Sequence, residues 1–150
     1  MRIPEELVMK IRSHGERTYP EECCGILLGS GSGADSVVQD IFEIDNSQDE
    51  NRRRRFFVTP EQYRKSEELA DSRGLMLLGF YHTHPDHPAA PSDFDLNHAL
   101  PWFTYVIMSV VQGEGGNVTA WVLREDRSQF DQTTFVVGRA TESLASRASG

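Results

Sequence analysis

The sequence has 150 residues, a hydrophobic content of 38% and a formal net charge of −8 at pH 7. This length suits one domain around one main core. The acidic balance argues against a protein that grips the phosphate backbone of nucleic acids, because that binding needs clustered Lys and Arg. The two cysteines are adjacent, which excludes a disulfide framework, and no apolar stretch has the length of a membrane span. We therefore expect a cytoplasmic protein with no membrane or nucleic-acid partner.

The first third of the sequence predicts one helix and two strands. Apolar residues recur at helical spacing over 4–17, which predicts an opening helix with His14 on its surface. The run 24–28 is typical of a short buried strand and is followed by a Gly-Ser turn at 29–33. Residues 37–44 then have the pattern of a partner strand.

The middle of the sequence holds a basic run and a clear helix start. The run Arg52 to Arg55 leads into a predicted short strand at 55–58, and we favour a solvated strand entrance over a docking patch for it. Thr59 can cap the next helix, and Gln62 completes a capping box with it. We expect that helix to end near Arg73.

The second half of the sequence is mainly strand-like. Its predicted strands are 75–84, 103–111, 118–124 and 129–137, with a hairpin turn at 113–117. Strands interleaved with helices predict an α/β fold with a mixed, partly barrel-like β-sheet flanked by helices. We assign residues 1–138 to a single domain and 139–150 to a polar tail that frays.

The stretch GFYHTHPDHPAAPSDFDL, residues 79–96, gathers three of the five histidines. On a strand, His82 and His84 project to one face and Thr83 to the other. Two converging imidazoles supply half of a zinc site, although such a pair can also lie half-exposed and bind nothing.

A second pair of residues follows within the same stretch. Ser92 can cap a helix that has Asp95 in its first turn, and a capping box alone would explain this spacing. Together with the histidine pair, however, Asp95 gives two nitrogens, one oxygen and an open position. Three protein ligands plus water is the arrangement of catalytic zinc sites.

A zinc hydrolase also needs a carboxylate to move protons. Glu22 is the attractive candidate because it directly precedes a predicted buried strand. From composition alone, its neighbour Glu21 is equally suitable.

These residues together resemble the JAMM/MPN-plus zinc metalloprotease family. The segments that carry the resemblance are ECCGIL at 22–27, HTHP at 82–85, Ser92 seven positions after that Pro, and then Asp95. The resemblance extends over most of the chain and is strongest to the short prokaryotic members. It selects Glu22 over Glu21 because Glu22 stands three positions before a Gly, as in the family pattern.

The resemblance implies a fold and a set of roles. The fold is the JAMM/MPN fold, which is cytidine-deaminase-like. The implied ligands of Zn²⁺ are His82, His84 and Asp95. The implied catalytic residues are Glu22, which deprotonates water and passes the proton to the leaving amine, and Ser92, which donates a hydrogen bond to the oxyanion.

Short members of this family resemble hydrolases that act on ubiquitin-like sulfur carrier proteins. The resemblance therefore implies cleavage after the C-terminal Gly-Gly of such a carrier, with release of cysteine in cysteine biosynthesis as one form of the reaction. The alternatives are a non-catalytic MPN-type scaffold, a JAMM hydrolase of another ubiquitin-like conjugate, and a tail-assembly or DNA-repair-like relative with the same ligands. The sequence leaves open a homodimer, the identity of the carrier, and any part played by His87, His98 or Cys23 at the site.

Overall fold

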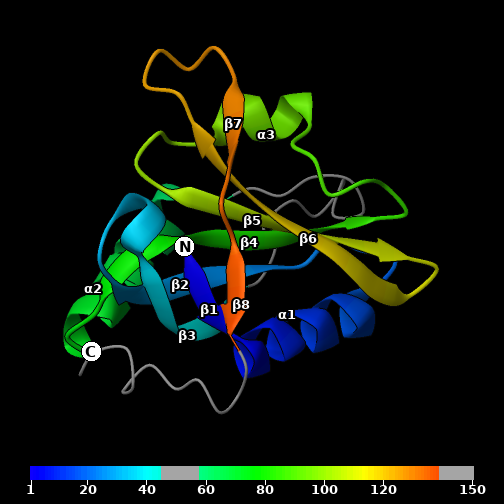
Figure 1. The fold of residues 1–150 in the computed structure, drawn as a ribbon, viewed down its shortest axis with the longest axis horizontal. Coiled ribbons are helices and arrows are strands. Elements are labelled where there is room, and N and C mark those ends of the chain that lie inside the picture. Colours follow the sequence, from blue (N-terminus) through cyan, green and yellow to red (C-terminus); the bar gives the residue numbers. More distant parts are fainter. Residues whose placement is uncertain (45–57, 139–150) are drawn as a thin grey trace.

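Residues 1–44 and 58–138, which the computed structural model describes, form one curled eight-stranded sheet with three α-helices packed around it (Figure 1). The helices are α1 (Glu5–Thr18), α2 (Pro60–Ser72) and α3 (Asp93–His98), with a short 3-10 turn, η1 (Gly33–Asp35). The strands are β1 (Arg2–Pro4), β2 (Cys24–Ser30), β3 (Val37–Ile44), β4 (Met76–Pro85), β5 (Thr104–Val111), β6 (Glu114–Leu123), β7 (Phe130–Thr133) and β8 (Val136–Gly138).

The sheet is mixed and nearly closes on itself. Its strand order is β7-β6-β5-β4-β2-β3-β1-β8, with β4 antiparallel to β2 and parallel to β5. The two edge strands, β7 and β8, follow one another in the chain and are separated only by Thr134 and Phe135. The chain therefore passes from one edge of the sheet to the other in two residues (Figure 1). This curvature confirms the predicted mixed, partly barrel-like sheet.

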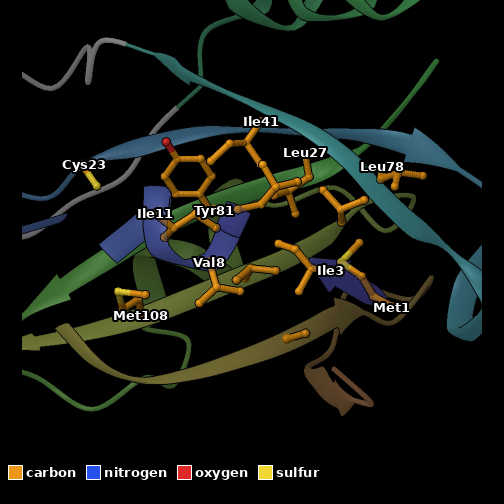
Figure 2. Packing of buried hydrophobic residues seen from close by; sticks show 14 of the residues in the cluster. Met1, Ile3, Val8, Ile11, Cys23, Leu27, Ile41, Leu78, Tyr81 and Met108 are labelled. Carbon is orange, nitrogen blue, oxygen red and sulfur yellow. The ribbon is translucent and has the colours of Figure 1, made fainter. Parts of the chain in front are cut away.

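Side chains that alternate along β4 divide the interior into two clusters. Tyr81 packs with the apolar face of α1, which includes Val8 and Ile11 (Figure 2). Phe80 faces the other way and packs with Ala70 and Tyr63 from α2. Because the period of a strand is two, the even-numbered positions that follow Phe80 stay on the α2 side of the sheet.

Several predicted elements are confirmed. The opening helix α1 and the strand β3 lie where the periodicity placed them. At the start of α2, the hydroxyl of Thr59 accepts a hydrogen bond from the Gln62 backbone N–H at 3.2 Å, and the Gln62 side chain accepts one from the Thr59 N–H at 2.9 Å. This reciprocal pair is the predicted capping box.

Three predictions about local structure are wrong or incomplete. The turn expected at 113–117 is shorter, because Gln112 and Gly113, with φ of 50° and 83°, already form a two-residue hairpin loop. The single strand expected at 129–137 is two strands, since β7 pairs with β6 and β8 pairs with β1. The short strand β1 was not predicted at all.

His14 is buried, with 5% of its surface exposed, and not on the helix surface as predicted. It lies on the same face of α1 as Leu7 and Ile11, and its Nδ1 is 2.8 Å from the hydroxyl of Tyr81. The hydrogen bond makes burial of a polar ring tolerable.

Some predictions fall outside the described residues. These are the run Arg52 to Arg55, the strand at 55–58 apart from the buried Val58, and the tail 139–150. Within the described part of the chain, no helix combines the length and the hydrophobicity needed to span a bilayer.

Gly25 allows β2 and β4 to pair closely beside the core, and we predict that Gly25→Ala destabilises the protein. An added Cβ would overlap the ring of Tyr81, which is fully buried. Overpacking of this kind lowers the free energy of unfolding by about 1 to 3 kcal/mol. Gly116→Ala is the control, because the nearest heavy atom there is 3.8 Å away. Urea denaturation that gives both variants the same midpoint would contradict this assignment.

Candidate metal centre

Strand β4 presents two buried imidazoles on its α2 side. His82 and His84 are 1% and 7% exposed, and their ring centroids lie 5.0 Å apart. Both follow Phe80 at the two-residue period, so they share its face of the sheet, as predicted from the sequence.

Helix α3 brings a carboxylate to the histidine pair. The Ser92 hydroxyl accepts a hydrogen bond from the Asp95 N–H at 3.1 Å, while Asp95 Oδ2 accepts one from the Ser92 N–H at 2.9 Å. This is the capping box considered from the sequence. The same bonds aim Asp95 at the imidazoles: its Oδ1 lies 3.3 Å from His82 Nε2, and its Oδ2 lies 3.2 Å from His84 Nε2.

The donor set of these three residues fits a metal ion. One ligand atom from each lies within 4.8 Å of the others, and all three residues are buried. Ligands held about 2 Å from a tetrahedral ion are about 3.3 Å apart, which matches the two nitrogen–oxygen distances. Imidazole nitrogens with one carboxylate oxygen are ligands that Zn²⁺ accepts, and three ligands leave one position open.

The hydrogen bonding of His84 also indicates a cation at this point. Its Nδ1 is 2.9 Å from the carbonyl oxygen of Pro88, which can only accept, so Nδ1 carries a hydrogen. In a neutral ring Nε2 then has a lone pair that points at the Asp95 carboxylate 3.2 Å away. Two such acceptors need a positive centre between them, either a proton on the ring or a metal ion.

The charge states around the centre suit metal binding. Burial lowers the pKa of His82 and so favours the neutral imidazole, which is the form that binds metals. Burial alone would raise the pKa of Asp95. However, the attraction of His82, the hydrogen bonds that the two rings donate when they are protonated, and the hydrogen bond from the Ser92 N–H hold that pKa well below its usual range. The carboxylate therefore remains ionised.

Glu22 lines the same cleft as His84. It precedes β2, is 4% exposed, and lines a cleft of about 500 Å³ together with His84 and Ser92. Burial, and after it the negative charge of Asp95, raises the pKa of Glu22 to about 9. A carboxyl group with this shift beside a possible metal is a candidate for proton transfer.

Thr83 fixes the segment that carries Glu22 to the strand that carries the histidines. Its hydroxyl accepts a hydrogen bond from the Cys23 N–H at 3.0 Å, and its own N–H donates to the Cys23 carbonyl at 3.1 Å. Cys23 packs in the cluster on the α1 side, so its thiol lies on the opposite face from the histidines. Burial raises the pKa of Cys23 to about 11, which keeps it a thiol near neutral pH.

His87, the third histidine of the stretch, and His98, just after it, do not join the group of candidate ligands. His87 is exposed where it lines the cleft. His98 is exposed on α3, where its ring stacks on Phe94 and its Nδ1 is 2.9 Å from the Phe94 carbonyl. Sequence reasoning missed Pro88, because its part is played by a backbone carbonyl and no side-chain pattern reports it.

A comparison with protein-family models matches residues 4–124 to the prokaryotic homologues of the JAB domain. The chain belongs to this prokaryotic JAB family. The match runs from the last residue of β1 to just past the end of β6 and contains all five residues singled out above. This confirms the JAMM/MPN resemblance.

Among similar proteins, a desampylase of Pyrococcus furiosus is 28% identical to this JAB-family chain over 116 residues, which is 77% of the chain and 76% of the relative. A probable TtuB-protein conjugate cleaving protease of Thermus thermophilus is 29% identical over 105 residues, or 70% and 67% of the two chains.

Solved structures agree with the fold. The solution structure of a Salinibacter ruber protein is 41% identical, with a TM-score of 0.71 and 92% of each chain covered. The crystal structure of a JAB1/MPN domain protein from Archaeoglobus fulgidus shares the fold, with a TM-score of 0.59 at 18% identity, over 91% of this chain and 98% of that one.

The burial of Glu22 predicts how the stability of the metal-free protein depends on pH. The folded protein holds a proton on Glu22 up to about pH 9, whereas the unfolded chain releases it near pH 4.5. The free energy of unfolding therefore falls as the pH rises between these values. We expect Glu22→Gln to remove this fall and to stabilise the metal-free protein at pH 8 by on the order of 1 to 3 kcal/mol.

Urea denaturation from pH 5 to pH 9 in the presence of a chelator measures this difference. Glu21→Gln is the matched control, because Glu21 is the half-buried neighbour with the same charge. Equal pH slopes for wild type and Glu22→Gln would show that Glu22 ionises as an exposed residue does.

Proposed function

We propose that this protein is a zinc-dependent peptidase or isopeptidase that hydrolyses the bond after the C-terminal Gly-Gly of a ubiquitin-like sulfur carrier protein. The observation that carries the proposal is the convergence of His82, His84 and Asp95, with Glu22 lining the same cleft as His84. Family membership supports the hydrolytic chemistry. The Thermus thermophilus relative, named for cleaving TtuB-protein conjugates, supports a protein conjugate as the substrate.

In this proposal the two imidazoles and the Asp95 carboxylate hold Zn²⁺. When bound, zinc supplies Lewis acidity: it polarises the scissile carbonyl and makes water acidic enough to attack at neutral pH. The ionised state of Asp95 and the neutral state of His82 are the forms that this binding requires.

Glu22 is proposed to move the protons of the reaction. A cation beside it would lower its raised pKa toward neutrality, because an opposite charge favours the ionised carboxylate. Glu22 can then accept a proton from the attacking water and return it to the departing amine. A base works best when its pKa lies near the working pH.

Ser92 is proposed to donate a hydrogen bond to the oxyanion. Its oxygen already accepts the Asp95 N–H, and a hydroxyl that accepts one bond can still donate its own hydrogen. Ser92 is exposed and lines the cleft with Glu22 and His84. Capping and oxyanion stabilisation are therefore compatible roles for one side chain.

The cleft supports a narrow, extended substrate tail. Its remaining lining comes from Pro85 at the end of β4 and from His87, Pro88 and Ala90 in the loop that follows. Glycine residues before the scissile bond would allow the substrate backbone to approach the metal without a side chain in the way. This favours a Gly-Gly tail, and release of cysteine from such a tail is the form of the reaction that we propose to test first.

The central experiment loads the protein with zinc and incubates it with a sulfur carrier that has cysteine joined to its C-terminal Gly-Gly. We expect mass spectrometry to show release of cysteine by wild type and none by Glu22→Ala. A parallel incubation with an isopeptide conjugate of the same carrier tests the wider class of substrate. The proposal fails if wild type cleaves neither substrate, or if Glu22→Ala cleaves as fast as wild type. Purification without stoichiometric zinc would favour the non-catalytic scaffold.

Ser92→Ala separates capping from catalysis. Loss of an oxyanion donor lowers kcat by about 100- to 1,000-fold, while loss of the cap lowers the free energy of unfolding by only about 1 kcal/mol. Ser92→Thr keeps the hydroxyl and should retain both properties. Steady-state kinetics and thermal denaturation are measured on the same samples. A fall in stability with an unchanged kcat would leave Ser92 with the capping role alone.

A further inference from the structure

The loop between β4 and α3 has few hydrogen-bond donors of its own. It contains Pro88 and Pro91 and follows Pro85 at the end of β4, and none of these three residues has a backbone N–H. Within the loop the Ala90 N–H donates to the Pro88 carbonyl at 2.9 Å. The carbonyls of His87 and Ala89 find their donors elsewhere in the protein. The loop also joins the segment with both candidate histidine ligands to the helix with the third ligand, so its position bears on the whole centre.

Three consecutive carbonyls of this loop each accept a hydrogen bond from a side chain outside it. The Ser109 hydroxyl donates to the His87 carbonyl at 2.6 Å. His84 Nδ1 donates to the Pro88 carbonyl at 2.9 Å. The Thr119 hydroxyl donates to the Ala89 carbonyl at 2.6 Å. The bond that orients His84 thus lies between two others, one from β5 and one from β6.

The position of Ser109 follows from an irregularity in the sheet. Met108 pairs with Val118, but Val110 pairs with Gly115, so one residue of β5 stands opposite two residues of β6. This is a β-bulge, a feature that redirects side chains and is common beside active sites. Ser109 is the single residue at the bulge, and it is 7% exposed.

The direction of the Thr119 hydroxyl is also determined. The indole Nε1 of Trp121 donates to Thr119 Oγ1 at 2.7 Å. Since the indole can only donate, the hydroxyl accepts on that side and its own hydrogen points to Ala89. Trp121, Thr119 and the Ala89 carbonyl therefore form a series of two hydrogen bonds, and in both bonds the donor hydrogen points toward the loop.

We propose that Ser109 and Thr119 are positioning residues that hold the loop so that the Pro88 carbonyl orients His84 for metal binding. The inference rests on the proposed zinc function. With the carbonyl in place, the hydrogen of the ring stays on Nδ1 and the lone pair of Nε2 faces Asp95. If the loop moves, the His84 ring can rotate or change tautomer, and its Nε2 no longer points to the metal position.

The test measures metal binding, without any substrate. Zinc affinity is determined by competition with a chromophoric chelator for Ser109→Ala, Thr119→Val and the double variant. We expect the double variant to bind zinc about 10-fold more weakly, the low end of the effect seen for partners of metal ligands. The absorption spectrum of the cobalt-substituted protein should change with it, because that spectrum reports ligand geometry.

Two controls accompany these variants. Thr119→Ser keeps the hydroxyl and should bind zinc as wild type does. Thr104→Val removes a threonine hydroxyl from β5 at a position paired with Gly79, where the described part of the chain offers it no side-chain hydrogen bond. It should also match wild type.

The tautomer of His84 gives an independent measurement. In the zinc-loaded protein, nitrogen chemical shifts should show the hydrogen of His84 on Nδ1 in wild type and a second state of the ring in the double variant. If the double variant does not fold, the same measurements are made on Ser109→Ala alone, which lacks only the hydrogen bond to the His87 carbonyl.

Wild-type zinc affinity, cobalt spectrum and tautomer in the double variant would overturn the inference. Failure of the proposed function would be seen differently, in a wild-type protein that binds no zinc or does not cleave the carrier adduct.

Discussion

The pairing of β2 with β4 is the constraint on which the site depends. In this register Cys24 lies opposite His82, which puts Glu22 on the same side of the sheet as the histidines. A slip of one residue would turn Glu22 toward α1, because neighbouring side chains of a strand point to opposite faces. Two features hold the register: Gly25, which alone leaves space for the ring of Tyr81, and the paired bonds between Thr83 and Cys23.

Local patterns in the sequence were enough to predict part of the site. The spacing of His82 and His84 predicts a shared face, and the spacing of Ser92 and Asp95 predicts a capping box; both follow from backbone geometry over a few residues. Glu22 is different, because it reaches the histidines through strand pairing across about sixty positions. Composition could not separate it from Glu21, and only the family resemblance did so.

Three features of the structure could not be predicted from the sequence, each for a physical reason. The burial of His14 depends on a partner, Tyr81, that is distant in the chain. The division of the last strand into β7 and β8 has no Gly or Pro signal, because the break is set by the curvature of the sheet. The carbonyl of Pro88 is a backbone group and has no sequence signature. The capping box of Ser92 and Asp95 was predicted correctly, and its two residues also have the proposed functional roles. Here the structural explanation and the functional one are compatible.

The nearly closed sheet also limits how a partner can approach. Three strands separate β4 from the end of the sheet beyond β7, and four separate it from the end beyond β8. An incoming chain that extended the sheet laterally would therefore remain far from His82 and His84. The cleft lined by Glu22, His84 and Ser92 lies instead at the end of β4, where the loop to α3 begins. A chain can therefore meet this cleft without adding a strand to either edge of the sheet.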